Sequence, residues 1–134
     1  MRFLFPIILL LASPAGAIVV NAGIPPASDT VISSGSVTSA GQTIALSADG
    51  FSAGAVQITG TWVGQFEFEA TVNGTTWISR NVYNGVGLTN ATAGTGIFTF
   101  PIGPFNSFRV RSSVFTSGSA TVFFRASNGG YYPQ

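Results

Sequence analysis

The segment from Gly60 to Ser127 alternates apolar and polar residues in short runs that glycine, asparagine and serine interrupt. A two-residue alternation is the period of a β-strand with one buried face, and no stretch repeats with helical spacing. Short strands separated by turn residues are typical of an antiparallel sandwich. We therefore predict an all-β protein, an antiparallel and jelly-roll-like β-sandwich of about seven to eight strands.

The expected strands follow from where this alternation begins and ends. They span residues 42–47, 55–62, 64–72, 75–83, 95–102, 107–115 and 119–127. Residues 37–128 then form the sandwich, with an extended arm at 18–36 before it and a tail at 129–134 after it. Pro25-Pro26 is incompatible with a helix in the arm, where we expect one edge strand at Thr30–Ser33.

Residues 1–17 have the parts of a secretory signal peptide. Arg2 supplies the positive start, Phe3–Leu11 the short apolar core, and the small residues up to Ala17 the cleavage pattern. The apolar run is too short for a membrane-spanning helix. We expect either export with cleavage after Ala17 or, where the segment is retained, its burial against a neighbouring subunit.

Several residue types on which enzymes depend are missing from the chain. It has no Cys, no His and no Lys, and its five cations are all arginines. A thiolate nucleophile, a histidine general base, a lysine Schiff base and a cysteine- or histidine-bound zinc are therefore excluded. We expect a non-enzymatic protein with no cofactor and no metal site.

Charged residues make up only 7% of the chain, and the formal net charge is +1. Nucleic-acid binding depends on cations that neutralise phosphates, so we expect no nucleic-acid partner. The surfaces of soluble monomers carry many more charges. A surface with so few charges favours self-association, and we expect a subunit of a homo-oligomer.

Asn73-Gly74 is the preferred dipeptide for a two-residue type I′ turn between antiparallel strands. Such a turn places Ala70 opposite Trp77 on the core face and Glu67 opposite Arg80 on the outer face. The core face gains an aromatic ring, and the outer face gains an ion pair between neighbouring strands.

Loops of other lengths change this register. A four-residue loop keeps the same facing and pairs Glu69 with Arg80. A three-residue loop sets Phe68 opposite Arg80, and the pattern disfavours it. The residues expected on the core face are Phe66, Phe68, Ala70, Val72 and Trp77.

A second hairpin is expected around the loop Thr116-Ser117-Gly118, in which Gly118 supplies the left-handed residue. This register keeps the apolar residues of both strands on one face. On the outer face it sets Arg109 opposite Arg125 and Arg111 opposite Phe123. Their inward neighbours Phe108, Val110, Ser112 and Val114 then face Ala126, Phe124, Val122 and Ala120.

Two arginines that face each other repel and need a nearby anion. Glu67 and Glu69 are the carboxylates expected on an outward strand face. We therefore expect their strand to lie beside this hairpin, or an acidic group of a partner to do so.

The spacing of the same two glutamates also suggests the hypothesis of a glycosidase active site. Glu67 and Glu69 lie about 7 Å apart on one strand face, close to the separation of a glycosidase pair. Such a pair also needs a cleft and one protonated member, which a neighbouring Arg80 opposes. We therefore expect a solvated face paired with arginine, and keep a small glycan-active enzyme as a third hypothesis.

Aromatic side chains could stack on the apolar faces of sugars. The candidates are Trp62, Trp77, Tyr83, Tyr131 and Tyr132. The predicted register places Trp77 in the core. Tyr131 and Tyr132 fall in the Gly- and Pro-containing tail, so we expect them to make contacts with a glycan or a neighbouring subunit.

Two strings of this chain, "GTWVGQFEFEATVNGTTW" from Gly60 and "FRVRSSVFTSGSATVFFRAS" from Phe108, carry a resemblance to a known class. They resemble a pattern in β-sandwich accessory structural proteins of tailed bacteriophages (decoration, head-fibre or tail proteins) and in related bacterial surface modules. The resemblance covers half of the chain. It implies a virion structural protein without enzymatic activity, whose partners are its own copies and other virion proteins such as the major capsid or tail protein.

The signal-like start departs from that pattern, because virion proteins assemble in the cytoplasm. The alternative is a secreted, extracellular carbohydrate-binding or adhesion module with a cleaved signal peptide and glycans as partners. For either function we expect the recognition surface on the charged outer face and the tail. Its residues are Glu67, Glu69, Arg80, Arg109, Arg111, Arg125, Tyr131 and Tyr132.

Overall fold

The computed structural model describes residues 30–128. Every regular element in this range is a β-strand, and paired strands are antiparallel, as predicted. No helix in this range is long and apolar enough to cross a membrane. The strands are β1 (Thr30–Val37), β2 (Thr43–Ser47), β3 (Ala53–Thr71), β4 (Ile78–Ser79), β5 (Val82–Tyr83), β6 (Leu88–Thr89), β7 (Ala91–Thr92), β8 (Gly96–Pro101) and β9 (Ser107–Ser127).

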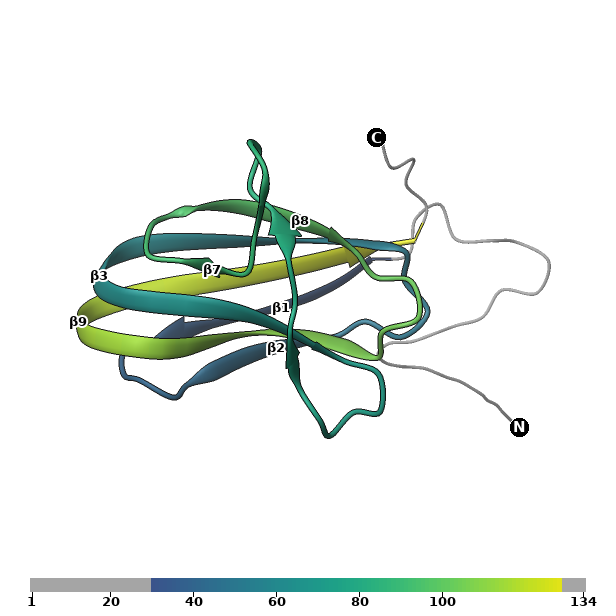
Figure 1. Ribbon diagram of the computed structural model, residues 1–134, viewed down its shortest axis with the longest axis horizontal. Coiled ribbons are helices and arrows are strands. Elements are labelled where there is room, and N and C mark those ends of the chain that lie inside the picture. The colour runs from purple at the N-terminus through teal and green to yellow at the C-terminus, as the bar shows by residue number, and fades with distance from the viewer. Residues whose placement is uncertain (1–29, 129–134) are drawn as a thin grey trace, which may run out of the picture.

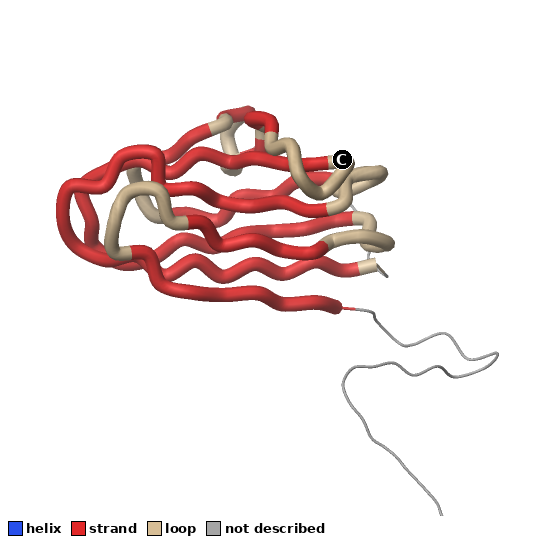
Figure 2. The backbone as a smooth tube through the Cα atoms, turned by 90° about the horizontal axis from the view of Figure 1, so that it is seen from below, coloured by secondary structure: helices blue, strands red, loops and turns tan. Residues whose placement is uncertain are grey.

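Two long strands, β3 and β9, run through the whole structure. They pair along their full lengths, from Ala53 opposite Ser127 to Thr71 opposite Ser107. This two-stranded ribbon turns over near its middle, so that its two halves lie in different layers (Figures 1 and 2). The first layer adds β1, β8, β5 and β6 to one half, and the second layer adds β2, β4 and β7 to the other.

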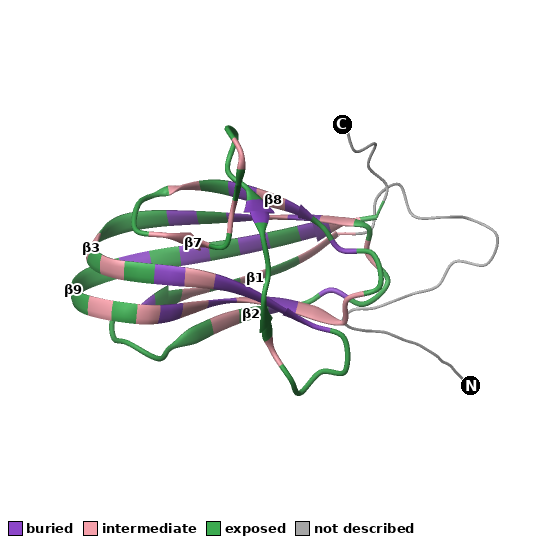
Figure 3. Cartoon of the chain, viewed as in Figure 1, coloured by how far each residue is buried: buried purple, intermediate pink, exposed green. Residues whose placement is uncertain are grey.

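The core lies between the two layers. Phe100 on β8 stacks on Phe108 at 4.2 Å between ring centroids and meets the edge of Phe124 at 6.2 Å. Phe108 and Phe124 lie in opposite halves of β9, so both can reach one ring only because the strand folds back. Buried and exposed residues alternate along both long strands (Figure 3), as a two-layer sandwich requires.

Glycines allow the ribbon to turn over. Gly60 and Gly118 have φ angles of +115° and +93°, in the region that favours glycine. A Cβ atom on Gly118 would collide with the backbone of Thr61 and Trp62 on the neighbouring strand. Register shifts accompany the bend, between Val63 and Gly64 and again two residues later. The middle of the ribbon therefore bends as a bulged ladder and does not break into turns.

The predicted hairpin around Thr116–Gly118 is wrong. Residues 107–115 and 119–127 are two halves of one continuous strand, and the strands expected at 55–62 and 64–72 likewise fall in one strand, which ends at Thr71. Glycine and serine interrupt the alternation at a bulged bend as they do at a tight turn, so the sequence pattern does not separate the two. Arg109 and Arg125 consequently do not face each other, and neither do Arg111 and Phe123.

The predicted register of the first hairpin is also wrong. Ala70 pairs with Ile78, and the Arg80 amide donates to the Phe68 carbonyl at 2.8 Å, which is the pairing that the pattern disfavoured. Asn73 accounts for the difference, because its side-chain oxygen accepts backbone N–H groups within the loop and closes a longer turn.

This register changes which residues are buried. Val72, expected in the core, is 65% exposed, and Trp77 lies outside the core in a partly exposed position. Val114, assigned to the inner face of the second hairpin, is 53% exposed. The other inward assignments agree with the structure, in which these residues are buried: Phe66, Phe68, Ala70, Phe108, Val110, Ser112, Ala120, Val122, Phe124 and Ala126.

The strand expected at Thr30–Ser33 is the start of β1, which pairs with β9 from Thr30 opposite Ser127. The signal-like residues 1–17, the rest of the predicted arm up to residue 29, and the tail at 129–134 lie outside the described residues.

Replacing Gly118 by Ala should lower the free energy of unfolding by at least about 2 kcal/mol, because the new methyl group meets backbone atoms and the φ angle is unfavourable. Gly87→Ala is the matched control, because Gly87 has open space around it and no left-handed φ. Its effect should stay below about 0.5 kcal/mol. Urea denaturation measures both, and equal losses would contradict this account of the bend.

Candidate functional site

Four charged side chains form a ladder on the outer face of the second layer. Glu69 on β3 accepts hydrogen bonds from the Nε groups of Arg109 at 2.6 Å and Arg111 at 3.1 Å on β9. Arg111 also donates from Nη2 to Glu67 at 2.9 Å. We call these four residues the charge ladder. The expectation that the glutamate strand lies beside the arginine strand is confirmed.

The pairing of β3 with β9 and the packing of Trp77 position the charge ladder. Arg109 lies directly opposite Glu69, and Arg111 lies opposite Glu67. The ring of Trp77 packs on the guanidinium of Arg109 at 4.3 Å, an attractive cation–π contact. Only 9% of the Glu69 side chain is exposed, compared with 31% for Glu67. Glu69 is therefore the centre of the ladder and Glu67 its exposed end.

The ladder is electrically balanced, with two carboxylates and two guanidinium groups. Both Glu69 oxygens are occupied by arginine N–H donors. A general acid or a nucleophile needs a carboxylate that can reach a substrate, and Glu69 is 9% exposed with both oxygens held by arginines. The geometry suits a structural contact between β3 and β9.

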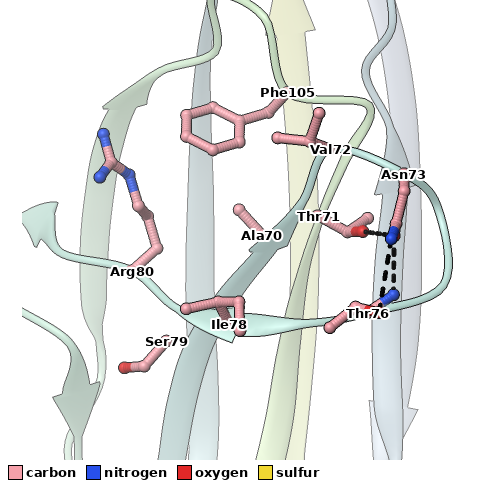
Figure 4. A pocket seen from close by; sticks show the side chains of 9 residues that line it. All are labelled: Ala70, Thr71, Val72, Asn73, Thr76, Ile78, Ser79, Arg80 and Phe105. Atoms are coloured by element: carbon pink, nitrogen blue, oxygen red, sulfur yellow. Dashed lines mark hydrogen bonds between the residues drawn. The ribbon is translucent and has the colours of Figure 1, made fainter.

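A surface hollow of about 510 Å³ lies at the end of the second layer (Figure 4). Its apolar side chains are Ala70, Val72, Ile78 and Phe105. Arg80 lies at one side, and its guanidinium carbon is 4.8 Å from the centre of the Phe105 ring. The hollow therefore combines apolar walls with one cation, a composition typical of binding sites for small groups.

Hydrogen bonds fix the wall that the Thr71–Thr76 loop contributes to the hollow. The Asn73 side-chain oxygen accepts the amides of Thr75 and Thr76, and the Thr71 hydroxyl accepts the amide of Gly74. The Asn106 amide donates to the Thr71 carbonyl and ties this loop to the segment that carries Phe105. A wall that is already ordered loses little conformational entropy on binding.

The sequence assigned the candidate site to one surface, and the structure divides it. Glu67, Glu69, Arg109 and Arg111 come together in the ladder, whereas Arg80 lies in the hollow and not opposite either glutamate. Arg125 is exposed on the outer face of the first layer. Tyr131 and Tyr132 lie outside the described residues.

The outer face of the first layer carries a group of exposed apolar side chains, of which the sequence suggested only Tyr83 as a binding residue. They are Ile32 (51% exposed), Tyr83 (47%), Ile97 (59%) and Phe123 (41%). Cross-strand pairs place them on one face together with Arg125, and we call this surface the apolar sheet face. Its residues come from four strands, so only the strand order reveals it.

The aromatic residues proposed for sugar stacking do not form one platform. Trp62 lies at the bend of the ribbon and packs edge-on against Phe66 at 5.2 Å. Its buried Nε1 has no hydrogen-bond partner among residues 30–128. Trp77 covers Arg109, and Tyr83 lies on the apolar sheet face. Trp62 and Trp77 therefore both have packing roles.

Within residues 30–128, no three Asp or Glu side chains lie close enough together to hold a metal ion. The chain has no His or Cys that could supplement such a group.

No family model and no curated protein sequence matches this chain. Solved structures with similar folds do exist. The SPBc2 prophage-derived protein YomS superposes with a TM-score of 0.68 and 16% identity, over 84% of this chain and 100% of YomS. The PBSX exported protein XepA gives 0.64 and 16% over 87% of this chain, which spans only 50% of XepA.

A chain from the disulfide-linked pili of Bacillus endospore appendages gives a lower TM-score of 0.42 at 12% identity, over 85% of this chain and 100% of that chain. At these identities the similarity concerns the fold. The expected resemblance to phage β-sandwich proteins is thus confirmed at that level: the described chain has the β-rich fold of the prophage-derived protein YomS, and XepA shares it.

Proposed function

We propose that this chain is a non-enzymatic structural protein of a phage particle, which decorates or reinforces a capsid or tail through contacts between its own copies. The observation that carries the proposal is the match with YomS, a prophage-derived protein whose whole length this fold covers. A small protein that consists of one such sandwich offers surfaces for assembly.

The charge ladder supports a non-enzymatic function. Its two carboxylates neutralise two arginines and hold β3 against β9, and Trp77 covers the buried end. The two carboxylates that a glycosidase would use for catalysis, Glu67 and Glu69, instead form ion pairs that stabilise the fold.

The apolar sheet face supports assembly from several copies. Exposed apolar groups that gather on one face mark contact surfaces in many proteins. An outer sheet face can pack against the same face of a second copy, the self-complementary arrangement of a two-fold interface. Arg125 lies on the same face and would be available to an acidic group of the partner.

A second candidate is an exported glycan-binding or adhesion module. The signal-like residues 1–17 favour it, and XepA, which shares the fold, is described as an exported protein. In this case the mature chain would begin at Ile18. Binding to a glycan array that is lost in a Tyr131→Ala, Tyr132→Ala variant would favour this candidate.

Particles released from cells that carry the native gene should contain this chain in a constant ratio to the major capsid or tail protein. Density-gradient purification followed by quantitative mass spectrometry measures that ratio. The intact mass of the recovered chain also shows whether residues 1–17 are kept. Recovery only outside the particle fractions, as a secreted chain that begins at Ile18, would contradict the particle assignment and favour the exported module.

Replacing Ile97 by Glu should weaken self-association at least tenfold, because a charge on the apolar sheet face would be desolvated when copies meet. Val86→Glu is the matched control, since Val86 is 92% exposed in the turn after β5 and its substitution should leave association unchanged. Sedimentation velocity over a concentration series measures the dissociation constants. Equal behaviour of the two variants would exclude this face as the contact.

Replacing Glu69 by Ala should cost about 2 to 3 kcal/mol of unfolding free energy, because two arginines lose a buried partner and then repel each other. Glu67→Ala removes one exposed pair and should cost less than about 1 kcal/mol. Urea denaturation compares the two variants. A larger effect at Glu67, or glycan hydrolysis that both substitutions abolish, would argue against a structural ladder.

A further inference from the structure

We infer that the hollow beside Arg80 is the docking site of the chain's own C-terminal segment, with a tyrosine ring of Tyr131 or Tyr132 seated between Ile78 and the Arg80 guanidinium. This inference is independent of the proposed particle function and concerns a contact within one chain. It rests on the chemistry of the hollow, on the place where the described chain ends, and on the residues that follow.

The hollow presents unusually exposed apolar groups. Val72 and Ile78 are 65% and 64% exposed, although they flank the partly buried Phe105. In Figure 4 these side chains and Ala70 surround one concave space, and Arg80 reaches across its side towards Phe105. An apolar ring placed there would remove from water the surface that these four side chains now expose.

Arg80 provides a second element of recognition. One face of its guanidinium rests against the Phe105 ring. No side-chain hydrogen bond and no ion pair of Arg80 occurs within residues 30–128. The opposite face can therefore stack on a second aromatic ring, the arrangement that guanidinium groups favour with tyrosine.

The described chain ends on the same side of the molecule as the hollow. Strand β9 ends at Ser127, whose carbonyl accepts the amide of Ser52. Ser52 in turn accepts the amide of Ile102, in the segment that leads to Phe105. Because the ribbon turns over, its two ends, Ala53 with Ser127 and Thr71 with Ser107, lie at the same end of the sandwich (Figure 1), and the hollow is beside the second of these.

The tail is long enough to cross from one layer to the other. Packed sheets lie about 10 Å apart, and neighbouring strands lie about 5 Å apart. Tyr132 follows Asn128 by four residues, which corresponds to at most about 14 Å of extended chain. The sequence Gly129-Gly130-Tyr131-Tyr132 thus places two glycines, which restrict the backbone little, before two aromatic rings.

The test uses the full chain with isotope-labelled isoleucine methyl groups and compares it with a Tyr131→Ala, Tyr132→Ala variant by NMR. The tail substitutions leave residues 30–128 unchanged, so the variant should fold. We expect the Ile78 methyl signal of the native chain to be shifted upfield by a ring current and to move downfield in the variant. The Ile97 methyl group, on the opposite outer face, is the internal control and should not move.

The reciprocal variant Arg80→Gln should release the tail and shift the ring signals of Tyr131 and Tyr132 towards those of a free peptide. An Ile78 signal that is the same in the native chain and the tyrosine variant would overturn the inference. A shift that disappears on dilution would also overturn it, because the occupant would then be the tail of a second copy. A shift that depends on residues 1–29 and not on the tyrosines would assign the hollow to the N-terminal segment instead.

Discussion

The continuous backbone ladder between β3 and β9 is the constraint on which the rest of the structure depends. Every other strand of the described chain except β5 and β6 pairs directly with one of these two. The ladder can serve both layers only because it bends without breaking. Gly60 and Gly118 make that bend without a Cβ collision, and the flanking register shifts increase the local twist. Once the ribbon has turned over, its two inner faces meet and the phenylalanine core follows.

The register of the same ladder also creates the charge ladder. Glu67 and Glu69 face Arg111 and Arg109 because those positions are direct neighbours across β3 and β9. A shift of one strand by one residue would turn its two charges towards the core, where unpaired charges are strongly unfavourable. The ion pairs therefore oppose slippage of the strands in addition to any stability that they contribute. Trp77 adds to this effect through its cation–π contact with Arg109.

The sequence predicted well which side chains point into the core, and predicted poorly which residues pair across neighbouring strands. Alternation correctly assigned Phe66, Val110 and Phe124 to the core, because facing depends only on the two-residue period. Pairing depends on which strand lies next in space, and Gly118 carries the same local signal in a bulged bend as in a hairpin turn. Arg80 was misplaced for a related reason, since the side chain of Asn73 lengthens the loop and shifts the register by one residue.

The two outer faces of the sandwich differ in a way that follows from strand order. The outer face of the second layer carries the charge ladder, whose two glutamates and two arginines pair with one another. The first layer collects apolar side chains from β1, β5, β8 and β9 around Arg125, a face with a cation and no compensating carboxylate on its paired strands. The two outer faces therefore differ in whether their charged side chains are paired. This difference supports the proposal that contacts between copies use the outer face of the first layer.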